Sequence, residues 1–436
     1  MKNLSYRINL YYKKRQNVKY GCVLMVKRNL YMERILRLID LDVIKIITGI
    51  RRCGKSYFLD LFINELKNKN IKDENIIHID LEHPKYNYIE KRNELDEILI
   101  PKLEENNQKK YLIIDEIQNI SEWEKSINGY YKAYNIDIYI TGSNSKLLSK
   151  ELATLLTGRY TEIKMYPFSF KEFLEYKKEL NHEILIKNKL KTDIENLFDE
   201  YFEYGGLPLA ISADIKDKQA ILQDLYSSIF LHDIIERYQI RNIGLLNRIT
   251  KYLIENTGNL ISANSIYKHL KQEKLSITPN TIYNYLEYLE KSYFISKVTR
   301  EDAIGLKEIN NSEKYYLIDP GFYKLNLEEK QQNKGKLLEN IVYLELLRLN
   351  YKITIGKIKD YEIDFIIRKN NKKAYIQVSY EIKNDKTRKR EIRPLLKLKD
   401  NYPKYLITTD REDYSQDGII HMNIIEFLKE AENIIL

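Results

Sequence analysis

Short apolar runs alternate with amphipathic stretches along the first 170 residues of the chain. Five runs rich in isoleucine predict buried strands, at residues 43–48, 75–82, 111–116, 136–141 and 160–166. A helical repeat occupies residues 31–39, 57–63 and 88–107, and Ser121 is expected to cap a further helix. Strands that alternate with helices predict an α/β fold, with a parallel sheet covered on both faces.

A glycine-rich loop follows the first expected strand and leads into a helix. The segment reads Gly49, Ile50, Arg51, Arg52, Cys53, Gly54, Lys55, Ser56, with Tyr57 next, and it matches the Walker A pattern G-x-x-x-x-G-K-S. Its backbone N–H groups and the helix dipole favour phosphate. We expect Lys55 at the β- and γ-phosphates of ATP and Ser56 at Mg²⁺. We also expect alkylation of Cys53 to block ATP binding, and ATP to protect the thiol.

The strand at 111–116 ends in two carboxylates, Asp115 and Glu116, as in a Walker B motif. Asp115 is placed to hold Mg²⁺ through water, and Glu116 to polarise the attacking water. The alternative is an ordinary strand with acidic residues at its exit. The Walker A loop upstream favours the first interpretation, so ATP and Mg²⁺ are the expected ligands.

Two further features point to sensing of the γ-phosphate. Ser143 and Asn144 follow the fourth strand, where many such ATPases have a polar residue that contacts the γ-phosphate. Of the two, Asn144 is the preferred candidate for this sensor residue. The alternative for both residues is helix capping. Arg159 precedes the fifth strand and could reach a neighbouring subunit as an arginine finger, which would require a homo-oligomer. The alternative for Arg159 is a surface salt bridge.

Several motifs together resemble a prokaryotic AAA-type P-loop ATPase family. They are residues 47–56, 114–118, 140–145, 158–159, the P-F-S-F-K-E-F block at 167–173 and Tyr204-Gly205-Gly206-Leu207-Pro208. The resemblance implies an ATPase core over residues 25–170, ATP use, and a lid segment around Gly205. It also implies a C-terminal region of unknown function with a winged helix and a nuclease-like fold. The helical pattern of residues 171–225 agrees with a lid over the nucleotide.

Residues 226–310 are expected to form a separate winged helix-like unit. Ser262 can cap one helix, and Thr278 with Pro279 can open the next. The second helix has the apolar face Ile282, Tyr285, Leu286 and Leu289, and residues 294–298 would be a wing strand. The unit could place that helix in a DNA major groove or contact a protein. Its outer face carries Asn280, Asn284, Glu287 and Glu290, and the glutamates disfavour tight phosphate contact.

Residues 311–436 resemble the PD-(D/E)XK nuclease pattern in order of elements. Glu339 lies on an expected helix, Asp364 in a strand, and Gln377 in the next strand. Gln377 stands where a Glu ligand is usual, and Ser379 stands where the pattern has Lys. Serine cannot supply positive charge, so we expect a nuclease-like domain without cleavage, unless Lys372 or Lys373 substitutes.

Composition adds little to these motifs. The 436 residues include 72 basic and 63 acidic ones, a net charge of +9 that is compatible with nucleic acid. Basic residues concentrate at 383–399, which predicts either DNA contact or a solvated helix face. No apolar run is long enough to span a membrane. Two cysteines exclude a disulfide framework, and a cytoplasmic location fits. Residues 1–24 are expected to be an extension before Met25.

The leading hypothesis is an ATPase that couples nucleotide state to the C-terminal domains. One alternative is a nucleotide-switched DNA-binding protein with little turnover. The other alternative is a Mg²⁺-dependent nuclease.

Overall fold

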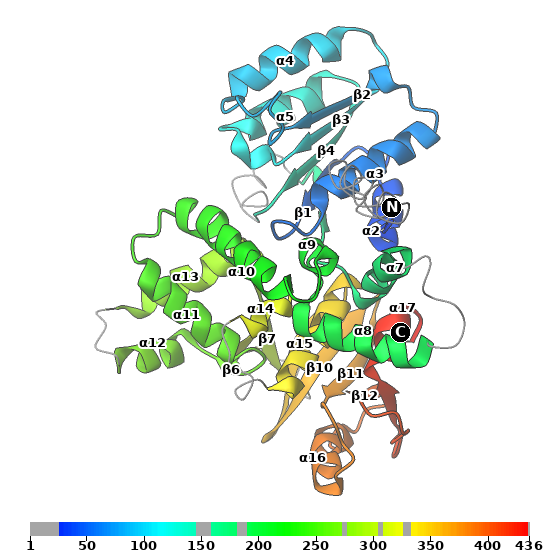
Figure 1. The fold of residues 1–436 in the computed structure, drawn as a ribbon, viewed down its shortest axis with the longest axis vertical. Coiled ribbons are helices and arrows are strands. Elements are labelled where there is room, and N and C mark those ends of the chain that lie inside the picture. Colours follow the sequence, from blue (N-terminus) through cyan, green and yellow to red (C-terminus); the bar gives the residue numbers. More distant parts are fainter. Residues whose placement is uncertain are drawn as a thin grey trace, which may run out of the picture.

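Two β-sheets lie at opposite ends of the molecule, with a layer of helices between them (Figure 1). The computed structural model describes residues 26–144, 158–180, 190–272, 277–303, 308–325 and 333–434. The expected extension at residues 1–24 and Ser145 of the resembling motifs lie outside these ranges.

The first sheet contains five parallel strands in the order β2-β3-β4-β1-β5. Their bounds are β1 (Ile44–Thr48), β2 (Ile76–Asp80), β3 (Lys110–Asp115), β4 (Ile136–Gly142) and β5 (Tyr160–Lys164). The expected parallel α/β sheet is therefore confirmed. Because the strands are parallel, the residues that follow β1, β3 and β4 meet at one edge of the sheet.

Helices cover both faces of this sheet, as expected. They are α2 (Asn29–Leu36), α3 (Lys55–Asn68), α4 (Arg92–Glu104) and α5 (Trp123–Ala133), with short 3₁₀ helices at Asp73–Asn75 and Ile117–Asn119. Alternate strand residues point to opposite faces. Ile47 and Ile113 pack with α2 and α3, whereas Ile46 and Ile114 pack with α4 and α5.

Ser121 is not the helix cap that the sequence predicted. Helix α5 begins at Trp123, and the residue before it, Glu122, has a left-handed backbone and no side-chain cap. The Ser121 hydroxyl instead donates a hydrogen bond to the Glu90 carbonyl at 3.0 Å. Ser121 thus joins two loops.

The middle layer is built from helices of the expected lid and of the segment after it. These are α7 (Phe170–Leu180), α8 (Leu190–Tyr204), α9 (Pro208–Ser212), α10 (Lys218–Ser228), a π-helix (Ile229–Glu236) and α11 (Ile243–Glu255). Helix α9 starts with Pro208 in its first turn, where a missing N–H costs nothing. The π-helix continues directly from α10.

Helices α12 (Ala263–Lys271) and α13 (Pro279–Lys291) have the caps expected from the sequence. The Ser262 hydroxyl accepts the Ser265 N–H at 3.1 Å, and the Thr278 hydroxyl accepts the Thr281 N–H at 3.3 Å. The apolar face of α13 is buried, also as expected.

The second sheet contains eight strands in the order β13-β12-β11-β10-β9-β7-β8-β6. Their bounds are β6 (Leu260–Ile261), β7 (Ile295–Asp302), β8 (Glu308–Leu317), β9 (Lys352–Ile358), β10 (Tyr361–Lys369), β11 (Lys372–Val378), β12 (Lys404–Thr408) and β13 (Ile419–Asn423). Strand β7, expected as a wing, pairs with β9 of the C-terminal segment. Residues 226–310 are therefore not structurally separate from the C-terminal segment, because one sheet spans both.

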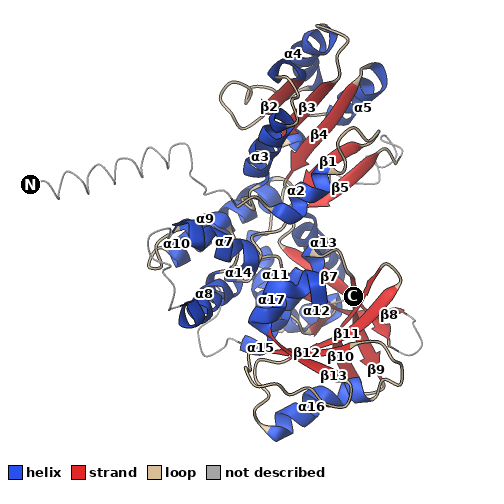
Figure 2. Cartoon of the chain, turned by 90° about the vertical axis from the view of Figure 1, so that its right-hand side faces the viewer, coloured by secondary structure: helices blue, strands red, loops and turns tan. Residues whose placement is uncertain are grey.

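Helices α14 (Gly321–Lys324), α15 (Lys334–Arg348), α16 (Asp385–Leu396) and α17 (Ile424–Ile434) accompany the second sheet (Figure 2). Phe365 and Ile376 pack with α15 and α17 on one face. Ile366 and Tyr375 pack with α16 on the other. Both sheets are thus covered on both faces.

Candidate active site

The glycine-rich loop connects the end of β1 to the first turn of α3. Gly49 has φ +152°, and a Cβ there would lie 2.3 Å from the Met165 carbonyl oxygen. Gly54 has φ +99° and directly precedes Lys55, the first residue of α3. Glycine is thus required at both positions by crowding and by backbone conformation. The loop opens onto the N-terminus of a 14-residue helix, the arrangement that binds phosphate.

Two other residues of the loop have buried side chains. The side chains of Ile50 and Cys53 are fully buried in the core, so these residues offer only backbone groups to a ligand. Burial also raises the pKa of the Cys53 thiol. The thiol is thus shielded in the folded protein, and the expected effect of its alkylation on ATP binding stays a prediction.

The Walker A lysine and the Walker B carboxylates meet at the edge of the first sheet. Lys55 Nζ lies 3.3 Å from Glu116 Oε1 and donates to the Gly49 carbonyl at 3.2 Å. The Ser56 hydroxyl is close enough to Asp115 to oppose the rise in the pKa of that carboxyl. The Thr141 hydroxyl donates a hydrogen bond to Asp115 and accepts the Glu116 N–H at 2.9 Å. The structure thus brings these four predicted residues together.

Burial and mutual charge set the ionisation of this group. Burial would lower the pKa of Lys55, but Glu116 together with Cys53 and Asp115 outweighs it and the pKa of Lys55 is raised. Burial would raise the pKa of Glu116, but Lys55 and a hydrogen bond from Gln118 outweigh it and that pKa is lowered. Burial and then Glu116 raise the pKa of Asp115. Lys55 and Glu116 therefore form a charged pair.

A pocket of about 280 Å³ lies beside the loop. The loop residues Arg51, Arg52, Lys55, Ser56 and Tyr57 line it, together with Glu82, Glu116 and the middle-layer residues Tyr176, Pro208, Leu209 and Ser212. Leu209 is 49% exposed, which leaves apolar surface next to the loop. The middle layer thus contributes one wall of the candidate site.

Asp233 is a site residue that sequence reasoning missed. It lies on the π-helix, is 1% exposed, and accepts a hydrogen bond from Arg51 Nε at 3.1 Å. Its other oxygen accepts from the Ser143 hydroxyl at 3.0 Å and lies 3.5 Å from Arg237. One sequence feature could have pointed to Asp233, because it is an acidic residue inside the largely apolar run Ile229–Ile235. Asp233 thus hydrogen-bonds both to the phosphate loop and to the segment that follows β4.

Asn144 also contacts the segment that follows the π-helix. Its Nδ2 donates to the Tyr238 hydroxyl at 3.1 Å. The Tyr238 ring stacks on the ring of Tyr288 in α13, with centroids 4.1 Å apart and planes 13° from parallel. Both sensor candidates, Ser143 and the preferred Asn144, are therefore tied to elements outside the first sheet.

Arg159 lies at the far end of the sheet from its own phosphate loop. Ile44, at the start of β1, donates its N–H to the Arg159 carbonyl at 2.8 Å. The guanidinium is exposed and lies 5.7 Å from the centroid of the Tyr131 ring. No ion pair involves Arg159 within the described part of the chain, so the surface salt bridge is not seen there. The finger role stays a prediction.

Comparisons with known proteins agree with this geometry. Residues 42–174 match a family model described as an AAA domain. An uncharacterized protein of Haemophilus influenzae is 36% identical over 405 residues, which are 93% of this chain and 98% of that protein. An uncharacterized protein of Methanocaldococcus jannaschii is 36% identical over 389 residues, covering 86% of this chain and 83% of that protein.

The chain belongs to this family of P-loop ATPases. In fold it is similar to the Walker-type ATPase of Pyrococcus abyssi, with a TM-score of 0.52, 18% identity, and coverage of 69% of this chain and 96% of that one. Two further family models match this chain, one at residues 195–332 and one at residues 334–427. Each is described as a domain of unknown function. Among the described residues, no helix is long and apolar enough to cross a membrane.

In this protein, the carboxylates of the nuclease-like pattern surround the ammonium group of a lysine. Lys314 Nζ, on β8, lies 2.8 Å from Glu339, 2.7 Å from Glu362 and 3.6 Å from Asp364. Lys336 adds a second ammonium 2.7 Å from Glu339. Burial and then Glu339 raise the pKa of Asp364 to about 7. The described residues contain no group of three or more His, Cys, Asp or Glu with metal-binding geometry.

Gln377 and the two lysines considered as substitutes do not complete a nuclease site. Gln377 Oε1 accepts the Asp364 N–H at 3.3 Å, and its Nε2 donates to Glu391 at 3.0 Å. Lys372 and Lys373 line a different pocket, at the turn between β10 and β11. Positive charge at the carboxylates comes instead from Lys314, which the sequence pattern gave no reason to select.

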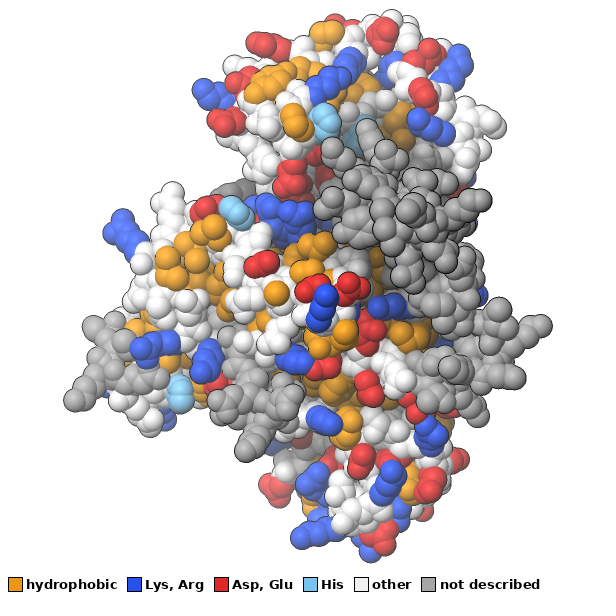
Figure 3. Space-filling view, in the orientation of Figure 1, with side chains coloured by type: hydrophobic (Ala, Val, Ile, Leu, Met, Phe, Trp, Pro, Cys, Tyr) orange, Lys and Arg blue, Asp and Glu red, His pale blue; other side chains and the backbone are white. Residues whose placement is uncertain are grey.

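The basic cluster at 383–399 coincides with α16 and the loop after it. Parts of the cluster are neutralised locally, since Arg388 pairs with Asp385 and Arg390 pairs with Glu391. Figure 3 shows acidic and basic side chains mixed at the end of the molecule that α16 occupies. DNA contact by the basic cluster stays a prediction.

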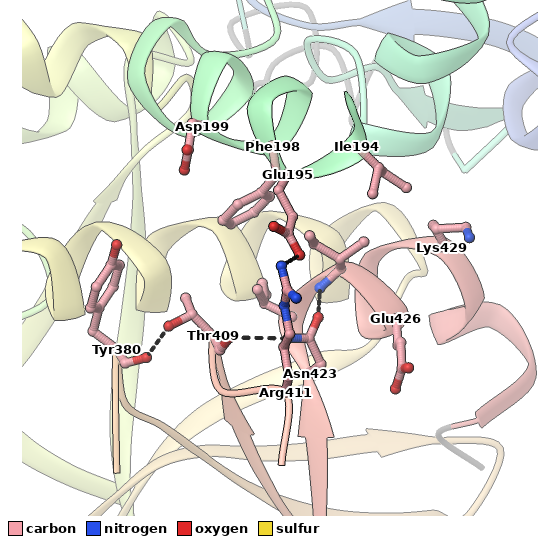
Figure 4. Close-up of a pocket in the computed structure, with 12 residues that line it drawn as sticks. Ile194, Glu195, Phe198, Asp199, Tyr380, Thr409, Arg411, Asn423, Glu426 and Lys429 are labelled. Carbon is pink, nitrogen blue, oxygen red and sulfur yellow. Dashed lines mark hydrogen bonds and ion pairs between the residues drawn. The ribbon is translucent and has the colours of Figure 1, made fainter. Parts of the chain in front are cut away.

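Another pocket, of about 670 Å³, lies between α8 and the ends of β12 and β13 (Figure 4). Arg411 pairs with Glu195 of α8 across it, and Asn423 Nδ2 donates to the Thr409 carbonyl at 3.1 Å. The first contact connects the middle layer to the second sheet, and the second contact links the ends of β12 and β13.

Proposed function

We propose that this protein binds and hydrolyses ATP and couples its nucleotide state to the second sheet and its helices. One observation carries the proposal. Lys55 lies 3.3 Å from Glu116 at the edge of a five-stranded parallel sheet, next to a glycine loop that opens onto a helix N-terminus. This combination of a phosphate-binding group with a positioned carboxylate base suits hydrolysis of a phosphoanhydride.

Each residue would have a definite task. The loop amides and Lys55 would bind the phosphates, and Ser56 with Asp115 would hold Mg²⁺, which supplies charge neutralisation when bound. Glu116, kept ionised by Lys55, would accept a proton from the attacking water. Tyr176 and Leu209, which line the same pocket, offer apolar surface for the base.

Coupling would use the contacts that leave the site. Arg51 and Ser143 both bind Asp233 of the π-helix. Asn144 binds Tyr238, which stacks on Tyr288 of α13. A γ-phosphate that competes for Arg51 or Asn144 would change these contacts and move the π-helix and α13 with them. The π-helix geometry, which is uncommon and often found at functional sites, supports such a role.

The test is ATP turnover and ATP binding in Lys55→Ala and Glu116→Gln. We expect Lys55→Ala to lose binding and Glu116→Gln to bind without turnover. Lys67→Ala, at the exposed end of the same helix, and Glu122→Gln are matched controls that should behave as wild type. Unchanged turnover in Lys55→Ala or Glu116→Gln would refute hydrolysis at this site.

The second candidate is a nucleotide-switched nucleic-acid-binding protein with little turnover. The contacts from Asn144 through Tyr238 to α13 favour it, because they give the nucleotide a path to the helix expected to approach DNA. Turnover measured with and without DNA separates the two candidates. Stimulation by DNA supports coupled hydrolysis, and ATP-dependent DNA affinity without turnover supports the switch.

A Mg²⁺-dependent nuclease has the least support. Lys314 lies among the carboxylates that a metal would need. We expect no cleavage of plasmid DNA with Mg²⁺ or Mn²⁺, and no difference between wild type and Asp364→Ala. Cutting that is lost in Asp364→Ala would establish the nuclease instead.

A further inference from the structure

A strongly basic pocket on the second sheet reaches from the β10–β11 turn to the β9–β10 turn. Its volume is about 1120 Å³, and it is bounded by the β10–β11 turn, by the start and end of β9, and by the loop after α16. Eight of its fifteen lining residues are lysine or arginine, and one, Asp400, is acidic. Such a concave surface of one sign concentrates anions.

Half of these eight basic side chains are not neutralised by an ion pair in the described residues. Arg368 pairs with Glu301, and Lys369 donates to the Leu349 carbonyl at 2.8 Å. By contrast, four exposed lysines form no ion pair within the described ranges. They are Lys352, Lys359, Lys397 and Lys399. Four like charges around one hollow repel one another, and a polyanion with several phosphates would relieve that repulsion.

The pocket also offers groups that suit a nucleic-acid base. Tyr402 is 46% exposed, and Lys373 Nζ lies 5.2 Å from the centroid of its ring. Asn370 and Asn371 form the turn with φ of 49° and 63°, and both are exposed. An aromatic face beside lysines is the combination that binds single strands, by stacking one base and pairing phosphates. An acidic peptide would use the lysines alone.

This pocket is distinct from the nucleotide site and from the carboxylates around Lys314. Lys314, Glu339, Glu362 and Asp364 are not among its lining residues. The exposed Lys383, which precedes α16, and the exposed Lys386 and Lys389 of α16 are not among the lining residues. The pocket is therefore also different from most of the basic cluster at 383–399.

We propose that this pocket binds a single strand of nucleic acid, with phosphates on Lys352, Lys359 and Lys399 and one base stacked on Tyr402. The proposal rests on the second candidate function and identifies its surface and ligand class. It does not depend on ATP hydrolysis, because none of the lining residues belongs to the AAA domain.

The experiment measures anisotropy of a fluorescent 20-nucleotide oligothymidylate with the full chain, without ATP, at increasing NaCl. We expect Lys352→Ser/Lys359→Ser/Lys399→Ser to weaken binding at least 30-fold at 0.1 M salt. The slope of log K against log salt should become less negative by about 2, since each lost phosphate contact on a single strand removes about 0.7. The triple Lys→Arg variant should bind as wild type.

The matched control changes the same number of charges outside the pocket. Lys383→Ser/Lys386→Ser/Lys389→Ser, on α16 and just before it, should stay within about threefold of wild type. Tyr402→Ala should weaken binding by about tenfold, as expected for one lost stacking contact, and Tyr402→Phe should not. Thermal melting of each variant checks that it is folded.

Several results would overturn the proposal. One is that the oligonucleotide fails to bind at 50 mM NaCl, and another is that the two serine triples weaken binding equally. A third is that polyglutamate displaces the oligonucleotide as readily as unlabelled oligothymidylate does, and a fourth is that a 20-base-pair duplex binds more tightly than the single strand. Displacement by polyglutamate would indicate an acidic protein partner. Repeating the titration with Lys55→Ala separates this proposal from the ATPase, because binding should persist in that variant.

Discussion

At the scale of residues, the most consequential contact is the buried pair between Lys55 and Glu116. The two side chains are only 3% and 9% exposed, and their charges stabilise each other 3.3 Å apart. Lys55 also donates to the carbonyls of Gly49 and Ile50. A phosphate that binds the loop must compete for an ammonium already engaged by these groups. The residue that would activate water therefore also limits how tightly the phosphates are held.

This competition predicts that Glu116→Gln binds ATP more tightly than wild type. The neutral amide keeps the shape of the side chain but removes its attraction for Lys55. We expect a three- to tenfold lower Kd, or about 1 kcal/mol, with turnover lost. Isothermal titration calorimetry with Mg·ATP measures this, and Glu122→Gln should leave Kd unchanged. Weaker binding in Glu116→Gln would mean that the carboxylate helps to hold the nucleotide.

At the scale of elements, the π-helix Ile229–Glu236 connects the AAA domain to the rest of the chain. Asp233 lies on it, and Tyr238 directly follows it. Its register therefore determines whether Ser143 and Asn144 have partners. Each of these contacts joins residues 90 or more positions apart in the sequence.

Tyr238→Phe tests whether this element transmits the nucleotide state. The substitution keeps the ring that stacks on Tyr288 but removes the hydroxyl that accepts from Asn144. We expect ATP to change the hydrogen–deuterium exchange of α13 in wild type and to have no such effect in Tyr238→Phe. The Kd for ATP should stay within threefold. Tyr252→Phe, on α11, serves as the control, and an undiminished response of α13 in Tyr238→Phe would exclude this path.

Contiguous motifs explain how much of this could be predicted from the sequence. The loop at 49–56 and the carboxylates at 115–116 could be placed because each lies in one short segment with a fixed geometric role. Asp233 and Lys314 could not, because their partners are distant in sequence and no local pattern marks them. Strand β9 was missed although Lys352-Ile353-Thr354-Ile355 alternates polar and apolar residues, because the alternation is short and Gly356 interrupts it.

At the scale of the whole molecule, the AAA domain and the second sheet are joined through buried polar contacts. Arg348 of α15 donates to the carbonyls of Pro167 and Phe168 at 3.3 and 3.2 Å. Asp319, which follows β8, accepts the N–H groups of Gly206 and Gly321 at 2.8 and 2.9 Å. A Cβ on Gly205 would lie 1.9 Å from the Asp319 carboxylate, so the glycine lets the two segments approach. The C-terminal region is thus not a loosely tethered appendage.

Asp319 should make stability depend on pH. Burial raises its pKa to about 6 from the ordinary value of 3.8, although the N–H groups of Gly206 and Gly321 oppose the rise. The folded state therefore holds a proton that the unfolded chain releases, and the associated stability is lost as pH rises through 6. Between pH 5 and pH 8, wild type should lose about 1 kcal/mol more unfolding free energy than Asp319→Asn. Urea unfolding measures this, and Asp73→Asn, at an exposed site, should follow wild type.

The position of Arg159 leads to a prediction about assembly. Tyr160, the next residue, pairs with Ile44 at the start of β1, whereas the phosphate loop follows Thr48 at its end. Arg159 therefore lies about one strand length, roughly 15 Å, from its own loop, and it could reach a γ-phosphate only in a neighbouring copy. A finger of this kind contributes about 10³-fold or more to the rate. Arg159→Ala alone should thus be nearly inactive, whereas Arg92→Ala, at an exposed pair in the same domain, should not be.

Mixing two inactive variants separates a finger in trans from a structural role. Arg159→Ala retains its own Glu116, and Glu116→Gln retains its own Arg159. In an equal mixture that assembles at random, half of the subunits carry Glu116, and half of those have a neighbour that supplies Arg159. If Arg159 acts on the neighbouring site, turnover should therefore recover to about one quarter of the wild-type rate. If Arg159 only stabilises its own subunit, the mixture should stay as inactive as its parts, because no site would regain what it lacks.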